Sequence, residues 1–210
     1  LLVENVNSSI DSVLLPVLSN SQDDPASVRE MTRRAIKVST YIMMPLMMGL
    51  AMCAEPLIHL LLTDKWLPCV PYLRIFCFAY AFYPLHTANL NAIKAMGRSD
   101  LFLLLEIVKK SVGLIMLLIT VRFGVFAMAL SMIPTSLFGQ IVNSLPNKKL
   151  LNYAYGRQLM DMLPAILLSC FMGALVFSVQ LLGLRDWVTL LIQVPLGVFA
   201  YIAGSALFKV

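Results

Sequence analysis

Charged residues are scarce in this chain: only 13% of its 210 residues are Asp, Glu, Lys or Arg. A soluble domain has about 25%, so the chain lacks the charge that a water-exposed surface needs. Hydrophobic residues make up 60% of the sequence, against about 45–50% in soluble domains. This composition excludes an ordinary soluble domain and predicts a membrane protein.

The chain also lacks the short motifs that mark many enzymes and metal proteins. It has no glycine-rich phosphate loop, no Gly-x-Ser-x-Gly elbow and no His-Glu-x-x-His zinc motif. Its cysteines, Cys53, Cys69, Cys77 and Cys170, form no Cys-x-x-Cys pair and have no histidine at metal-binding spacing. This pattern is typical of small buried hydrophobic residues. We therefore predict that the chain is not an enzyme and that it has no metal site and no cofactor.

Seven hydrophobic helices are expected, so the predicted fold class is all-α, a polytopic membrane helix bundle of about seven spans. The second helix is expected to be capped at Ser27, in a capping box with Glu30. One long span over 112–142 is an alternative, but it would place Arg122 inside the membrane, so we favour a hairpin there. The expected helices cover residues 1–18, 27–62, 72–95, 101–120, 125–145, 158–182 and 187–208.

The first expected helix has an unusually polar face for a membrane span, with Glu4, Ser8 and Asp11 at helical spacing. We expect this face to meet a cavity or other helices, and a soluble amphipathic helix remains the alternative. The chain starts Leu-Leu-Val without Met and shows no signal peptide. We therefore expect it to begin inside a helix of a longer protein.

The net charge of +5 does not indicate nucleic acid binding, because the basic residues lie between the hydrophobic runs. There they are typical of topology signals and of contacts with lipid headgroups. Ten basic residues lie in or beside the connections that follow odd-numbered helices, and four lie in or beside the connections that follow even-numbered helices. Because basic loops stay in the cytoplasm, the first group of connections is predicted to be cytoplasmic. The loop around Trp66, which belongs to the second group, is predicted to lie outside. The ten are Arg29, Arg33, Arg34, Lys37, Lys94, Arg98, Lys148, Lys149, Arg157 and Lys209, and the four are Lys65, Arg74, Arg122 and Arg185.

The segment 101–120 is long enough to cross a bilayer, yet it carries Glu106, Lys109 and Lys110 in its first half. Each charge at the bilayer centre costs at least about 2.5–3.5 kcal/mol, so we expect these charges to face an interior surface. Glu106 and Lys110 are four residues apart in the favourable order and are expected to pair, which leaves Lys109 as the freer cation. Both lysines could instead snorkel to the cytoplasmic headgroups, and the sequence leaves this alternative open.

A cationic cavity inside a membrane suits an anionic substrate, and lysine serves well as a point charge for phosphate. We therefore predict a substrate site for a diphosphate or sugar at Lys109, Lys110, Glu106 and Asp11. Internal carboxylates can also bind a coupling H⁺ or Na⁺. Glu4 and Asp11 are the candidates for that role.

Four stretches of the sequence resemble bacterial polysaccharide flippases of the O-antigen, capsule and colanic-acid exporter type. These lipopolysaccharide biosynthesis proteins form part of the multidrug/oligosaccharidyl-lipid/polysaccharide exporter superfamily. The resemblance covers essentially the whole chain. It is carried by SSIDSVLLPVLS, MTRRAIKVSTYIMMPLMMGLAMCAEPLIHLLLTDKW, NAIKAMGRSDLFLLLEIVKKSVGL and NYAYGRQLMDMLP.

The resemblance implies a fold of two helical lobes that face a central cavity and work by alternating access. Residues 1–145 would be transmembrane helices of the C-terminal lobe, and residues 146–210 a cytoplasmic connection with two final transmembrane helices. The implied location is the cytoplasmic (inner) cell membrane, in multi-pass form. The N-terminal lobe, the opposing wall of the cavity, has no counterpart in these 210 residues.

The implied function is transport of undecaprenyl-diphosphate-linked oligosaccharide across the cytoplasmic membrane for surface polysaccharide biosynthesis. The implied partners are this lipid-linked oligosaccharide and membrane lipids, with a polysaccharide polymerase and other assembly proteins left open. A lipid II flippase or a cation-coupled drug exporter of the same superfamily is the nearest alternative. An integral-membrane transferase and a non-transporting component of a polysaccharide assembly complex are more remote ones.

Overall fold

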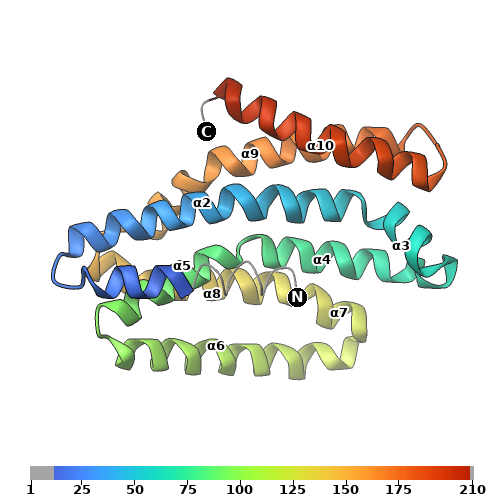
Figure 1. Cartoon of the computed structure of the whole chain (residues 1–210). Helices are drawn as coiled ribbons and strands as arrows, with labels where there is room; N and C mark the ends of the chain where they lie inside the picture. The colour runs from blue at the N-terminus through green and yellow to red at the C-terminus, as the bar shows by residue number, and fades with distance from the viewer. Residues whose placement is uncertain (1–11, 209–210) are drawn as a thin grey trace.

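The computed structural model describes residues 12–208, which form a bundle of helices without a strand in that range. The helices run back and forth between the two ends of the molecule (Figure 1). This arrangement confirms the predicted all-α membrane bundle. After a first helical stretch at 12–19, the elements are α2 (Pro25–Met52), α3 (Ala54–Leu62), η1 (Asp64–Cys69), α4 (Val70–Ala81), α5 (Tyr83–Ala95), α6 (Ser99–Thr120), η2 (Val121–Phe123), α7 (Val125–Leu130), α8 (Met132–Leu150), α9 (Tyr155–Gln180) and α10 (Asp186–Phe208).

Four helical stretches in the described range are long and apolar enough to cross a membrane. They are α2, the joined α7 and α8, α9 and most of α10. α6 is of similar length but holds three charged residues in its apolar part. The α4–α5 pair and α6 nevertheless run between the same two ends as the four (Figure 1). The hairpin predicted between 101–120 and 125–145 is confirmed, with its turn at η2 and Gly124.

The predicted span 72–95 is broken in two, because α4 ends at Ala81 and α5 starts at Tyr83. Pro84 lies in the first turn of α5, and proline has no N–H and clashes with the carbonyl four residues earlier. A continuous helix is therefore disfavoured at this point. The predicted polar connection from Pro146 also begins later, since α8 continues to Leu150.

α2 crosses the whole molecule although it contains Pro45. Proline cannot donate to the carbonyl four residues earlier, which belongs to Tyr41. The hydroxyl of Tyr201 on α10 donates to that carbonyl at 2.8 Å, so the backbone group stays satisfied inside the bundle. The predicted cap at Ser27 is wrong: the helix is capped by Asp24, whose carboxylate accepts from the Ala26 amide at 3.0 Å.

The main core lies where α2 packs against α5 and α9. At one end of this core, Arg33 of α2 donates twice to the carboxylate of Asp161 on α9, at 2.7 and 2.8 Å. Tyr153 donates to the same carboxylate at 2.9 Å. The largest apolar side chains of this core are almost completely buried, among them Ile36, Met43, Leu85 and Met162.

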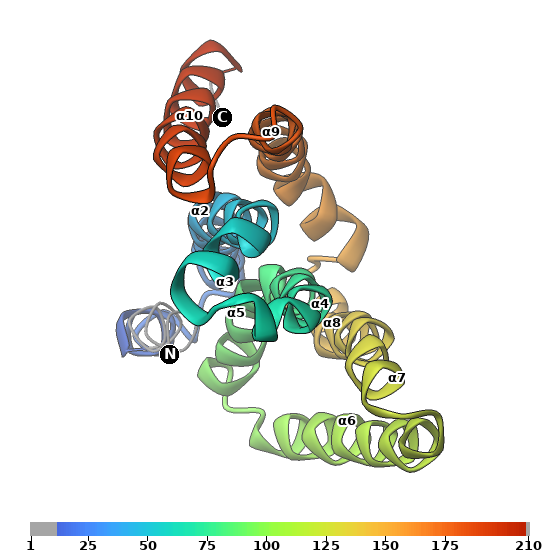
Figure 2. The ribbon, with the colours of Figure 1, turned by 90° about the vertical axis from the view of Figure 1, so that its right-hand side faces the viewer.

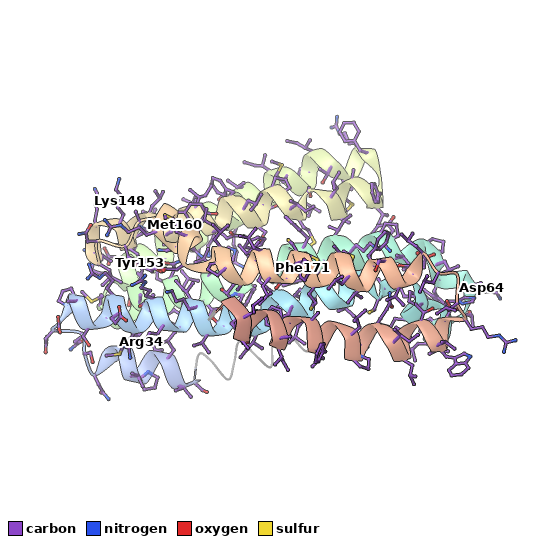
Figure 3. The ribbon with its side chains drawn as sticks, turned by 90° about the horizontal axis from the view of Figure 1, so that it is seen from above. Arg34, Asp64, Lys148, Tyr153, Met160 and Phe171 are labelled. Atoms are coloured by element: carbon purple, nitrogen blue, oxygen red, sulfur yellow. The ribbon has the colours of Figure 1, made fainter. Side chains whose placement is uncertain are left out.

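The basic connections gather at one end of the bundle, as the charge pattern predicts. Arg34, Lys148 and Tyr153 lie at this end, and Asp64 lies at the opposite end (Figure 3). Which end faces the cytoplasm stays a prediction from the excess of lysine and arginine.

Candidate functional site

A cavity of about 790 Å³ lies among α4, α5, α6, α7 and α8. In Figure 2, α6 lies apart from α4, with α5 on one side and α7 and α8 on the other. Residues of all five helices line the cavity. The three charged residues of α6 predicted to bind substrate line this cavity. They are Glu106, Lys109 and Lys110.

The charges of α6 pair differently from the sequence prediction. Lys109 donates to the carboxylate of Glu106 at 2.5 Å, and these side chains are 18% and 28% exposed. Lys110 is exposed and has no ion pair or hydrogen bond within the described part of the chain. The prediction that Lys110 pairs with Glu106 and leaves Lys109 free is therefore wrong. Side chains three residues apart on a helix are neighbours, just as side chains four residues apart are, so Glu106 can pair with either lysine.

Gly139 of α8 leaves space for His86, next to Lys109. A Cβ atom at this position would lie 3.5 Å from Lys109 Cδ and 2.8 Å from Cε1 of His86. The missing side chain thus makes room for the imidazole ring beside the backbone of α8, whereas 3.5 Å is an ordinary van der Waals contact for the lysine stem. Lys109 lies against a neighbouring helix here instead of on a lipid-facing surface.

His86 of α5 joins the same cavity wall, which sequence reasoning missed. The side-chain amide of Asn143 on α8 lies 3.0 Å from Nδ1 of the ring. The available signal was its spacing: His86 and Asn89 lie three residues apart on one face of the predicted span 72–95.

Aromatic side chains of α4 and α5 line another wall of the cavity. The rings of Tyr80 and Tyr83 lie with their centres 6.0 Å apart, and Tyr83 lies 6.1 Å from His86. Tyr72 makes an edge contact with Phe126 at 5.8 Å. The cavity therefore combines charged groups on one helix with aromatic faces on others.

A buried amide network holds α5, α8 and α9 together behind the cavity. Asn147 donates to the side-chain oxygen of Asn89 at 2.6 Å, and Gln158 donates to the same oxygen at 3.0 Å. Asn89 in turn donates to Gln158 at 2.8 Å. All three residues have no exposed surface. Buried amides with several partners fix the positions of the helices that carry them.

The remaining predicted site residues, Glu4 and Asp11, lie outside the described residues. Within residues 12–208, no group of three or more His, Cys, Asp or Glu side chains could hold a metal ion. The four cysteines are free, with Cys53 and Cys77 buried, Cys69 partly exposed and Cys170 exposed. The charged side chains that line the cavity in the described range are the Glu106–Lys109 pair and the unpaired Lys110.

Residues 1–71 match a family described as polysaccharide biosynthesis protein. An uncharacterized membrane protein in the cps region of Klebsiella pneumoniae is 36% identical over 76 residues, which are 36% of this chain and 16% of that protein. The teichuronic acid biosynthesis protein TuaB of Bacillus subtilis (strain 168) is 25% identical over 99 residues, 47% of this chain and 20% of that protein. The matched region thus spans a fifth or less of either relative's length.

The fold is that of a solved flippase. The structure of the lipid II flippase MurJ, in an inward closed conformation, matches 98% of this chain with a TM-score of 0.78. The match covers 44% of the MurJ chain at 19% sequence identity, so it shows a shared fold and nothing about the substrate. Together, the family match, the two relatives and this fold confirm the predicted resemblance to flippase-type polysaccharide biosynthesis proteins, in a multi-pass helical protein of the cell membrane.

Proposed function

We propose that the chain is part of a flippase that moves undecaprenyl-diphosphate-linked oligosaccharide across the cytoplasmic membrane by alternating access. The chain would act as a non-enzymatic transporter component, with residues 1–145 contributing helices to one lobe. The names of the two relatives mention a cps region and teichuronic acid biosynthesis, which favours a polysaccharide precursor over lipid II.

The observation that carries the proposal is the mixed lining of the cavity between α4 and α8. Lysine ammonium groups suit the phosphate oxygens of a diphosphate, and Lys109 and Lys110 supply two of them from one turn of α6. Tyrosine rings can pack against the faces of sugar rings, and Tyr72, Tyr80 and Tyr83 line the same cavity. A cavity of about 790 Å³ has room for a diphosphate and part of an adjoining sugar.

Lys110 is the stronger candidate for the first contact with the diphosphate. It is exposed, and it has no acidic partner among the described residues. Lys109 is held by Glu106 at 2.5 Å, so a phosphate would have to compete with that carboxylate. Glu106 would then set how strongly the site holds its anion and keep it from binding too tightly for release.

A coupling ion would bind at Glu4 or Asp11, on the polar face of the helix that the sequence predicts over residues 1–18. This part of the proposal rests on the sequence alone, since intramembrane carboxylates commonly take part in H⁺ or Na⁺ coupling. Exchanging each for its amide in a transport assay driven by a proton or a sodium gradient tests it. The expected result is that transport no longer responds to one of the two gradients, while its response to the other is unchanged.

The main test replaces Lys110 by Gln in the full-length protein and measures surface polysaccharide at matched expression. A charged hydrogen bond contributes about 1.5–3 kcal/mol, so we expect display to fall by about tenfold or more. Lys65→Gln is the matched control, because Lys65 lies in η1 outside the cavity. Unchanged display in Lys110→Gln and in the double variant Lys109→Gln/Lys110→Gln would exclude the cationic site.

Substrate choice is tested separately, by reconstituting the full-length protein in vesicles. Vesicles are loaded with either lipid-linked oligosaccharide or lipid II, and accessibility of the sugar from outside is followed over time. The proposal expects movement of the oligosaccharide substrate. Movement of lipid II alone would show that the protein is a lipid II flippase.

A further inference from the structure

A second hollow lies at the end of the bundle that carries the basic connections. It has a volume of about 520 Å³ and lies between the start of α2, the 151–154 linker and the first turns of α9. Figure 3 shows Tyr153 and Met160, two of its lining residues, at this end. The lining also includes Arg29, Arg33 and Arg157.

The acidic residues of this hollow already have basic partners. Asp161 is only 10% exposed and accepts from Arg33 at 2.7 Å, with the Lys37 ammonium 3.3 Å away. Burial raises the pKa of Tyr153, so its phenol stays protonated and donates to Asp161 at 2.9 Å. The other carboxylate of the hollow, Glu30, pairs with Arg34 at 3.1 Å.

Two guanidinium groups of the hollow remain without a partner. Arg29 of α2 and Arg157 of α9 form no ion pair and no hydrogen bond with their side chains across the described residues. Around the hollow, five basic side chains face two carboxylates, which leaves a net charge of about +3 (five minus two). The five are Arg29, Arg33, Arg34, Lys37 and Arg157, and the two are Glu30 and Asp161.

We infer that this hollow binds the phosphate group of a membrane lipid, with Arg29 and Arg157 as its donors. Each planar guanidinium can donate two parallel hydrogen bonds to a phosphate. The hollow opens at the end predicted to be cytoplasmic, where anionic lipids gather around basic residues. A lipid phosphate bound there would lie across the contact between α2 and α9 and hold these helices together from outside.

The site is distinct from the cavity of α6, because the two share no lining residue. Its existence therefore does not depend on the proposed transport function. A binding assay without transport tests it, so failure of the lipid site and failure of the flippase proposal give separate results.

The experiment measures the melting temperature of the full-length protein in detergent as lipid is added. Phosphatidylglycerol is expected to raise the melting temperature more than phosphatidylcholine does. In Arg29→Gln/Arg157→Gln the extra rise should fall by at least half. The matched control is Lys148→Gln/Lys149→Gln, which removes the same charge from the same end but outside the hollow, and it should keep the rise.

Equal losses in the two double variants would show only a diffuse surface charge and overturn the site. No loss in either would overturn it as well. If Arg29→Gln/Arg157→Gln does not fold, Arg29→Lys/Arg157→Lys replaces it. This second variant keeps the charge but lacks the fork geometry, so the site predicts a reduced rise, and a full rise would contradict it.

Two further additions identify the source of the phosphate. If undecaprenyl diphosphate raises the melting temperature through the same arginines and phosphatidylglycerol does not, the site belongs to the lipid-linked substrate. The reverse result would assign it to the surrounding anionic lipid. An equal, arginine-dependent rise with inorganic phosphate alone would overturn recognition of a lipid.

Discussion

The ammonium of Lys109 lies 2.5 Å from the carboxylate of Glu106, one turn earlier on α6, in the wall of the larger cavity. Both groups are more than two-thirds removed from solvent. Removing one member of such a pair leaves the other charge without compensation, whereas replacing both costs much less. The pair therefore makes a direct prediction about stability.

Lys109→Gln and Glu106→Gln are each expected to lower the free energy of unfolding by about 1–3 kcal/mol, the cost of a buried polar group left without its partner. The double variant should lose less than the sum of the two, with a coupling energy of about 0.5–3 kcal/mol. Chemical unfolding of the full-length protein in detergent measures all three. Lys110→Gln is the control, because Lys110 has no partner among the described residues, and it should change stability by less than about 0.5 kcal/mol. Strict additivity would contradict the pairing.

Gly139 gives a second prediction, because a methyl group there would overlap His86. The Cβ of Gly139→Ala would lie 2.8 Å from Cε1 of that ring, so the ring or α8 must shift. We expect a loss of about 1–3 kcal/mol. The control is Gly113→Ala on α6, where no atom lies within 4 Å of the new Cβ.

In an open helical position, alanine gains about 0.5–1 kcal/mol over glycine. The two substitutions should therefore change the melting temperature in opposite directions. A rise at both positions would show that the space beside Gly139 is not needed. Transport by Gly139→Ala should also fall, because the displaced ring lines the cavity.

Much of the fold could be predicted from the sequence, since apolar runs of membrane length separated by turn residues define the helices. The hairpin after α6 was predictable because a single long span would place Arg122 inside the membrane, and in the structure Gly124, with φ of +90°, ends the turn. The break before α5 was harder to predict. Proline within a span can be tolerated, as Pro45 is in α2, or can divide it, as Pro84 does.

These two prolines differ in what surrounds them, which local sequence does not reveal. The carbonyl freed by Pro45 finds the hydroxyl of Tyr201, 160 residues away in the chain. The candidate site shows the same limit. Its lysines could be predicted from charge inside a span. Which of them pairs with Glu106 could not, because Lys109 packs beside Gly139 of another helix.

The Tyr201 hydroxyl yields a third prediction. Tyr201→Phe removes the donor to the Tyr41 carbonyl and leaves that carbonyl unsatisfied beside Pro45. An unpaired buried acceptor costs about 1–3 kcal/mol, and the melting temperature of the full-length protein should fall accordingly. The matched control is Tyr80→Phe, because the Tyr80 hydroxyl makes no hydrogen bond to another described residue. An equal effect of both substitutions would argue against a role for the bond.

The last prediction concerns His59, at the end of the bundle predicted to face outside. Its ring contacts the carboxylate of Asp186 at the start of α10 and that of Asp64 in η1. The hydrogen bond with Asp186 and the negative charges of Asp186 and Asp64 raise the pKa of His59 above its ordinary value. Protonated histidine thus ties α3 to α10 more strongly than the neutral form does.

Because the pKa is raised in the folded state, the stabilisation is fully present below the unfolded pKa of about 6.5. It is lost as the pH rises through the raised, folded-state pKa. The wild-type protein should therefore melt higher than His59→Gln at about pH 5.5, and the two should converge at higher pH. Lys65→Gln, a neighbouring exposed cation with no ion pair in residues 12–208, should show no such dependence. If the melting temperatures of the wild-type protein and His59→Gln differ by the same amount at about pH 5.5 and at higher pH, the contact with Asp186 does not depend on protonation.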